Sequence, residues 1–179
     1  AFGKSAMQDN TVGEANTGLG NYALANNTTA DHHTAVGYQA LFTNTTGSEN
    51  VGIGKDSLLL NTTGSKNTAV GTDALNANTT ASFNTAVGSD ALGANTTGEN
   101  NTAVGKNALE SNTTGTLNTA VGKDALGSNT TGTNTAVGRE ALRDNTTGTN
   151  NVSMGVSTLS SNTTANSNTG IGNSALKDN

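Results

Sequence analysis

Few side chains of this sequence are of types that could do catalytic chemistry. His32 and His33 are the only histidines, and they stand beside Asp31. Such a group could form a metal or acid/base site, although an ordinary substitution in a surface loop is the simpler interpretation. The chain has no cysteine, which excludes disulfides, thiol chemistry and cysteine-based metal sites. We therefore predict no catalytic residues, no metal site and no cofactor, and expect that the chain is not an enzyme.

A second set of titratable side chains recurs at one position of a repeating pattern. Its acidic members are Asp56, Asp73, Asp90, Asp124 and Glu140, and the basic residues found one position earlier in the pattern are Lys55, Lys106, Lys123 and Arg139. Stacked carboxylates could bind calcium, but their spacing from glycine differs from that of calcium-binding repeats. Opposite charges side by side on a solvated edge are the favoured interpretation. No glycine-rich phosphate loop occurs.

The triplet Asn-Thr-Thr also recurs, and it matches the N-x-[ST] acceptor for N-linked glycans. Its asparagines are Asn27, Asn44, Asn61, Asn78, Asn95, Asn112, Asn129, Asn145 and Asn162. In a secreted eukaryotic protein each could carry a glycan, although the triplet also suits a tight turn, which is the favoured interpretation. Its threonines, such as Thr62 and Thr63, would form two parallel ranks that resemble those of ice-binding β-solenoids.

All these positions belong to one 17-residue repeat, N-T-A-V-G-x-x-A-L-x-x-N-T-T-G-x-x. Its central glycines are Gly3, Gly20, Gly37, Gly54, Gly71, Gly88, Gly105, Gly122, Gly138, Gly155 and Gly172. The single 16-residue step, from Gly122 to Gly138, lacks a residue after Gly132. Surface corners tolerate such deletions, so we place this one at a corner.

The repeat predicts an all-β protein. In Thr-Ala-Val segments the Thr and Val share one face of a strand, while Gly and Asn suit corners. The A-L-x-x-N stretch is too short for a stable helix. We predict a parallel β-solenoid with one coil per repeat, a single domain of about eleven coils over residues 1–179. Two aliphatic columns are expected to form its core: Val36, Ile53, Val70, Val87, Val104, Val121 and Val137, with Leu41, Leu58, Leu75, Leu92, Leu109, Leu126 and Leu142.

Two columns of asparagine accompany these aliphatic columns. One precedes each strand, at Asn67 and Asn84 for example, with His33 as the exception. The other follows the leucine of each repeat, from Asn10 to Asn179, and includes the asparagines of the Asn-Thr-Thr triplets. Stacked amides can hydrogen-bond along the axis as ladders. They can equally cap their own turns, and the sequence leaves the two possibilities equal.

The composition indicates a thin core that requires additional apolar burial through association with other chains. Only 31% of the residues are hydrophobic and 12% charged, with 23 glycines, no proline and a net charge of -5. Two large aliphatic residues per coil bury little area against the entropy of ordering 17 residues. We therefore expect a homo-oligomer, either a trimer or a filament. The mild acidity argues against nucleic acid as a partner, and no apolar run is long enough to insert into a membrane.

Several copies of the repeat carry a family resemblance: Asn50-Val51-Gly52-Ile53-Gly54, Asn67-Thr68-Ala69-Val70-Gly71 and Asn168-Thr169-Gly170-Ile171-Gly172. They resemble the head repeats of YadA-like trimeric autotransporter adhesins, and also the repeats of phage-type tail fibres and cell-surface fibres. The adhesin unit is shorter and usually has Val where this chain has Thr68. The resemblance implies a left-handed parallel β-roll or β-helix, three chains side by side, and a role in attachment.

These observations favour a structural role outside the cell. We expect a segment of a longer fibre or adhesin, at the cell surface, in the extracellular space or on a virion, whose ligand the repeat does not identify. The alternatives are a glycosylated self-assembling filament and an ice-binding solenoid that uses the Thr ranks. Binding specificity would then lie in the positions that vary between coils.

Overall fold

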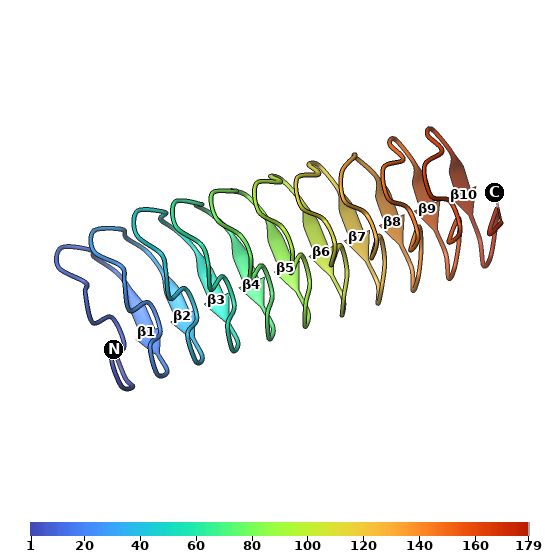
Figure 1. Ribbon diagram of the computed structural model, residues 1–179. Coiled ribbons are helices and arrows are strands. Elements are labelled where there is room, and N and C mark those ends of the chain that lie inside the picture. The colour runs from blue at the N-terminus through green and yellow to red at the C-terminus, as the bar shows by residue number, and fades with distance from the viewer. Residues whose placement is uncertain (179) are drawn as a thin grey trace.

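The computed structural model describes residues 1–178 as a stack of similar coils, each contributing one short strand to the same wall (Figure 1). Asn179, the last member of one Asn column, lies outside the described residues. The strands are β1 (Thr17–Leu19), β2 (Thr34–Val36), β3 (Val51–Ile53), β4 (Thr68–Val70), β5 (Thr85–Val87), β6 (Thr102–Val104), β7 (Thr119–Val121), β8 (Thr135–Val137), β9 (Val152–Met154) and β10 (Thr169–Ile171). The predicted parallel β-solenoid is confirmed.

The ten strands pair in sequence order into one parallel sheet, so each coil contacts only its neighbours. From β1 to β10 the chain makes about nine turns of ~17 residues. Before β1, Phe2 forms only an isolated parallel bridge with Leu19. The eleven central glycines therefore correspond to ten strands and one partly formed coil at the start.

The 16-residue step leaves the sheet undisturbed, as predicted. Strands β7 and β8 keep the common register, with Thr119 opposite Thr135 and Ala120 opposite Ala136. The missing residue is taken up at the corner, where Gly132 has a φ of 97°. Other coils place a non-glycine residue with positive φ at this corner, for example Lys66 at 59°. The corner at Gly132 is thus one residue shorter than the others, and the positive φ of this glycine lets the chain turn there.

The far side of each coil uses an uncommon conformation. In the coil that follows β4, both Asp73 (φ 57°) and Leu75 (φ 50°) are left-handed, and the same two positions are left-handed in coil after coil. A bulky residue avoids this region unless its surroundings over-determine it. Here the leucine side chain is completely buried, so packing inside the coil offsets the backbone strain.

The core differs in one column from the prediction. The leucine column is confirmed, because Leu41, Leu58, Leu75, Leu92, Leu109, Leu126 and Leu142 have no exposed surface. The other predicted column is wrong: Val36, Ile53, Val70, Val87, Val104, Val121 and Val137 are partly or largely exposed. The buried strand position is the middle one, which holds Ala35, Ala69, Ala86, Ala103, Ala120 and Ala136.

Lack of space in the coil explains why alanine and not valine faces inward. At Gly52, the middle residue of β3, an added Cβ would lie 3.1 Å from Ser57 Oγ and 3.3 Å from Leu41 Cγ. The leucines from the opposite wall therefore leave room for about one methyl group. Since alternate residues of a strand point to opposite faces, the Thr and Val on either side of the alanine must point out.

The central glycines are required by the closeness of the coils. Gly88 has a φ of 138°, and a Cβ there would lie 2.5 Å from the carbonyl oxygen of Gly105 in the next coil. A side chain therefore meets both a disfavoured backbone conformation and a backbone atom that cannot move aside.

We predict that Gly88→Ala lowers the free energy of unfolding by about 2 to 4 kcal/mol, because strain and the backbone contact add. Gly127→Ala is the matched control, since its Cβ would meet no atom closer than 3.4 Å, and we expect a change within about 1 kcal/mol. Urea unfolding of both variants measures the difference. Equal effects would contradict the proposed role of the close approach.

Candidate functional site

The outer face of the sheet carries a row of apolar side chains that extends along the coils. The first and third residues of each strand point outward, and none of these positions in β1 to β10 is charged. The third positions, with Phe2 before them, form what we call the aliphatic stripe: Phe2, Leu19, Val36, Ile53, Val70, Val87, Val104, Val121, Val137, Met154 and Ile171. Exposure is 36% at Val104 and 45% at Met154, whereas Val36, Val70 and Val137 are half-buried.

The aliphatic stripe is continuous because the register is constant. With strands about 4.8 Å apart, the ten steps from Phe2 to Ile171 make it roughly 48 Å long. A row of threonines and two valines runs beside it, at the first strand positions such as Thr68, Thr85 and Thr102. Large contiguous apolar patches on protein surfaces are typical of interaction sites. Sequence reasoning found the residues but placed them inside the coil.

The asparagine columns form ladders that run through the interior. In the Asn-Thr-Thr column, Asn78 Nδ2 donates to Asn61 Oδ1 at 2.7 Å and to the Ala81 carbonyl at 3.0 Å. The first bond joins two coils and the second closes the residue's own turn. The same amide therefore forms the axial ladder and caps its own turn, the two possibilities that the sequence leaves open. Its burial is tolerated because its polar atoms are paired.

The second asparagine column makes a different pair of bonds. Asn67 Nδ2 donates to the Ala81 carbonyl of the next coil at 2.8 Å, and Asn67 Oδ1 accepts the backbone N–H of Asn84 at 3.0 Å. The Ala81 carbonyl therefore receives one amide from each column. The two ladders meet at this carbonyl and tie the corner to the preceding coil.

The predicted glycan acceptors do not suit that role in the folded chain. All nine are fully buried: Asn27, Asn44, Asn61, Asn78, Asn95, Asn112, Asn129, Asn145 and Asn162. The amide nitrogen to which an N-linked glycan attaches is the same nitrogen that donates along the ladder. A glycan at this atom would require the ladder to open, which favours the interpretation of the triplet as a turn and ladder element.

The two threonine ranks of the triplets are not equivalent. In the first rank the hydroxyl donates to the backbone carbonyl of the next coil, as Thr62 Oγ1 does to Thr79 at 3.0 Å. In the second rank the side chains are exposed, as at Thr63 and Thr80. Only one rank presents free hydroxyls, which weakens the basis for the ice-binding alternative without testing it. Thermal hysteresis of the purified chain is the measurement that tests it.

The acidic column lies on the far side of the coils, opposite the sheet. Ion pairs join neighbours in sequence, between Lys55 and Asp56 and between Lys123 Nζ and Asp124 Oδ2 at 2.7 Å. Opposite charges side by side were the favoured interpretation of this column. Outside this column, the hydrogen bonds from Arg143 lower the pKa of the half-buried Asp144 carboxyl.

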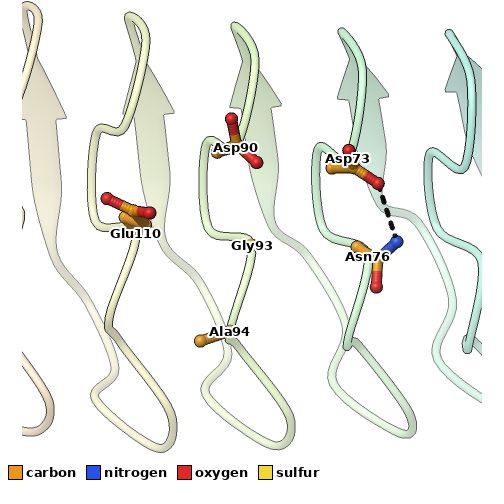
Figure 2. A pocket seen from close by; sticks show the side chains of 6 residues that line it. All are labelled: Asp73, Asn76, Asp90, Gly93, Ala94 and Glu110. Carbon is orange, nitrogen blue, oxygen red and sulfur yellow. Dashed lines mark hydrogen bonds between the residues drawn. The ribbon is translucent and has the colours of Figure 1, made fainter.

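Two acidic positions lack an adjacent base and line a shallow pocket with Glu110 (Figure 2). There, Asp73 Oδ1 accepts from Asn76 Nδ2 at 3.1 Å, and Asp90 Oδ2 accepts from Ser89 Oγ at 2.7 Å. Residues 1–178 contain no group of three or more His, Cys, Asp or Glu arranged to hold a metal ion. The pocket is a solvated acidic edge.

The two histidines do not converge on one site. His33 is buried, with 1% of its surface exposed, whereas His32 is exposed and has a φ of 62°. Asp31 Oδ1 accepts the backbone N–H of Glu14 at 2.7 Å. The trio is therefore a corner in which one histidine has an interior place and the other faces solvent.

A small aromatic cluster went unnoticed in the sequence. Tyr22 lies edge-on to Tyr38, with ring centroids 6.4 Å apart, and to Phe42 at 6.2 Å. Lys4 Nζ lies 5.8 Å from the Tyr22 ring. The rings come from variable positions of neighbouring coils, and their separations of 16 and 20 residues would have shown that stacking brings them together.

Comparison of the chain with protein-family models, with curated proteins and with solved structures finds no match. Within residues 1–178, no helix has the length and apolarity needed to cross a membrane. The assignment of function therefore rests on the geometry of the coils.

We predict that Asn78→Ala lowers the free energy of unfolding by about 2 to 4 kcal/mol, since it leaves the buried Asn61 Oδ1 and Asn95 Nδ2 each short of a partner. Asn76→Ala, at the half-buried edge two residues away, should cost less than about 1 kcal/mol. Chemical denaturation of the two variants gives the comparison. If the asparagine ladder contributed nothing to stability, the two variants would have equal free energies of unfolding.

Proposed function

We propose that the chain is a structural segment of an extracellular fibre or adhesin that mediates attachment to a surface, and that its copies associate side by side through the aliphatic stripe. The observation that carries this proposal is the stripe itself. A continuous row of outward-facing aliphatic side chains, flanked by threonine and free of charge, runs along the whole sheet, and each member is exposed or half-buried. Such a face is stabilised when a similar face covers it.

The thinness of the coil supports association. Each regular coil buries one leucine and two alanines, and the remaining interior positions are mostly paired amides. Apolar burial within a single chain is therefore small for its length. Covering the stripe would add a second apolar layer, on the opposite side of the sheet from the leucines.

The constant repeat favours a symmetric assembly. Every coil presents the same two outward side chains, so two copies brought into register at one coil are in register along the sheet. A closed arrangement in which each chain turns its stripe to a common axis buries all copies equally. The resemblance of the repeat to YadA-like adhesin heads and to fibre repeats supports three chains around that axis.

The mechanical part of the proposal follows from the axial bonds. Each coil is linked to its neighbours by backbone bonds in every wall, for example Leu75 N–H to the Ala91 carbonyl at 3.0 Å and Asp90 N–H to the Thr72 carbonyl at 3.0 Å. A stack bonded on all sides resists bending. It would project or space a binding surface away from its anchor.

We predict that the wild-type chain sediments as a multiple of 17.7 kDa, and that Val87→Lys/Val121→Lys sediments as a monomer. Both valines point outward, so lysine there keeps the coil intact while placing charge in the covered face. Analytical ultracentrifugation over a concentration series measures the change.

The matched control is Thr80→Lys/Thr114→Lys, which adds the same charge at exposed corner positions away from the sheet. It should keep the wild-type mass, and circular dichroism should show the same strand signal for all three proteins. A wild-type chain that stays monomeric at high concentration would refute association through the stripe.

A further inference from the structure

One position of the interior ladders is occupied by a group that can change its charge. The column before the strands holds asparagine at Asn16, Asn50, Asn67, Asn84, Asn101, Asn118, Asn134, Asn151 and Asn168, and His33 stands in the same column between the first two. An amide has no titration near neutral pH, whereas an imidazole does. His33 is therefore the titratable member of this column of hydrogen-bonding side chains.

The His33 ring copies the two bonds of an asparagine. Where Asn67 Oδ1 accepts the backbone N–H of the next coil, His33 Nδ1 accepts the backbone N–H of Asn50 at 3.2 Å. Where an asparagine amide donates to a corner carbonyl, the ring faces the carbonyl of Gly47. Toward the preceding coil, the His33 backbone N–H donates to Asn16 Oδ1 at 2.9 Å, and the asparagines of this column make the same bond in other coils.

The partners assign the tautomer of the ring. The Asn50 N–H can only donate, so Nδ1 must accept and carries no proton. The proton of the neutral ring is then on Nε2, on the side of the Gly47 carbonyl and 3.1 Å from Asn44 Nδ2. Asn44 Nδ2 already donates to Asn27 Oδ1 and to Gly47, so it has no further hydrogen for the ring.

We propose that His33 makes the rod acid-sensitive at this one corner: a proton added to Nδ1 faces the Asn50 N–H, breaks that bond and releases the corner between β2 and β3. Two donors then oppose each other in the interior, and a charge is buried with them. The asparagine rungs elsewhere keep their bonds over the same pH range. Opening is thus confined to the segment from about Asn44 to Asn50.

The surroundings do not compensate for the charge. The titratable groups of this corner are Asp31 and His32 in the same coil, with Glu14 and Glu49 in the coils on either side. Asp31 is half-buried and already accepts from the Glu14 backbone, and the other three are exposed, where water screens them. Burial lowers the pKa of His33 below its ordinary value, against the raising effects of the Asn50 and Gly47 backbone and of Asp31.

The sign of the pH effect follows from that direction. A histidine in the unfolded chain titrates near pH 6.5. Because the folded-state pKa is lower, the neutral ring contributes stability that is fully present above this value and is lost as the pH falls from it toward the folded-state pKa. Acidification below about pH 6.5 should therefore destabilise the corner.

The test compares His33→Asn with His32→Asn at pH 7.5 and pH 5. His33→Asn restores the asparagine rung, so it should fold, and its Tm should fall by about 2 to 4 °C less than that of wild type on acidification. His32→Asn removes the exposed histidine of the same corner and should keep the wild-type response. Equal pH responses of wild type and His33→Asn would overturn the proposal.

Two direct measurements distinguish protonation of His33 from general effects of acid on the protein. Nitrogen-15 spectra of the wild-type ring at neutral pH should show an unprotonated Nδ1, and hydrogen exchange at pH 5 should show loss of protection confined to residues 44–50. Protection that falls equally in all corners, or a proton found on Nδ1 at neutral pH, would contradict it. These outcomes do not depend on whether chains associate through the aliphatic stripe.

Discussion

Hydrogen bonds along the axis, from each coil to the next, are the interaction on which the rest of this structure depends. They bring successive backbones so close that the carbonyl of Gly105 occupies the place where a side chain on Gly88 would begin. The same closeness aligns like residues in columns. An asparagine in one coil therefore meets an asparagine in the next, and its amide can be satisfied in the interior. The polar composition is thus compatible with order, because few buried polar groups in the described part of the chain lack a partner.

The period and the direction of the coils could be predicted from the sequence, since the glycine spacing, the Thr-Ala-Val segments and the asparagine corners all indicate one strand per 17 residues. The burial of the strands could not. A period of two places Thr68 and Val70 on one face and Ala69 on the other, but it does not say which face is inside. The larger apolar residue normally takes the interior, and here it does not.

The reason lies on the opposite wall. Leu75 adopts a left-handed conformation, which no propensity rule anticipates for a bulky residue. That conformation sends the leucine into the interior, where it leaves space only for alanine at the strand. The asparagine triplet shows the same limit of sequence reasoning in another form. The letters of a glycan acceptor and of a ladder turn are identical at Asn78, and only the burial of its nitrogen distinguishes them.

The interior residues stabilise each coil, whereas the residues on the outer face of the sheet could be substituted without disturbing it. The leucines, alanines and amide ladders are fixed by contacts within the stack, so substitutions there disturb two neighbouring coils at once. The outward positions meet no such restriction, yet Val87, Val104 and Val121 are aliphatic in successive coils, where threonine or lysine would serve solubility better. The repetition of an apolar column that the coil interior does not need is the feature that the proposed association of chains accounts for. The variable corners, such as the one that holds Tyr22 and Tyr38, are left free to differ from coil to coil, because the axial bonds there are made by the backbone.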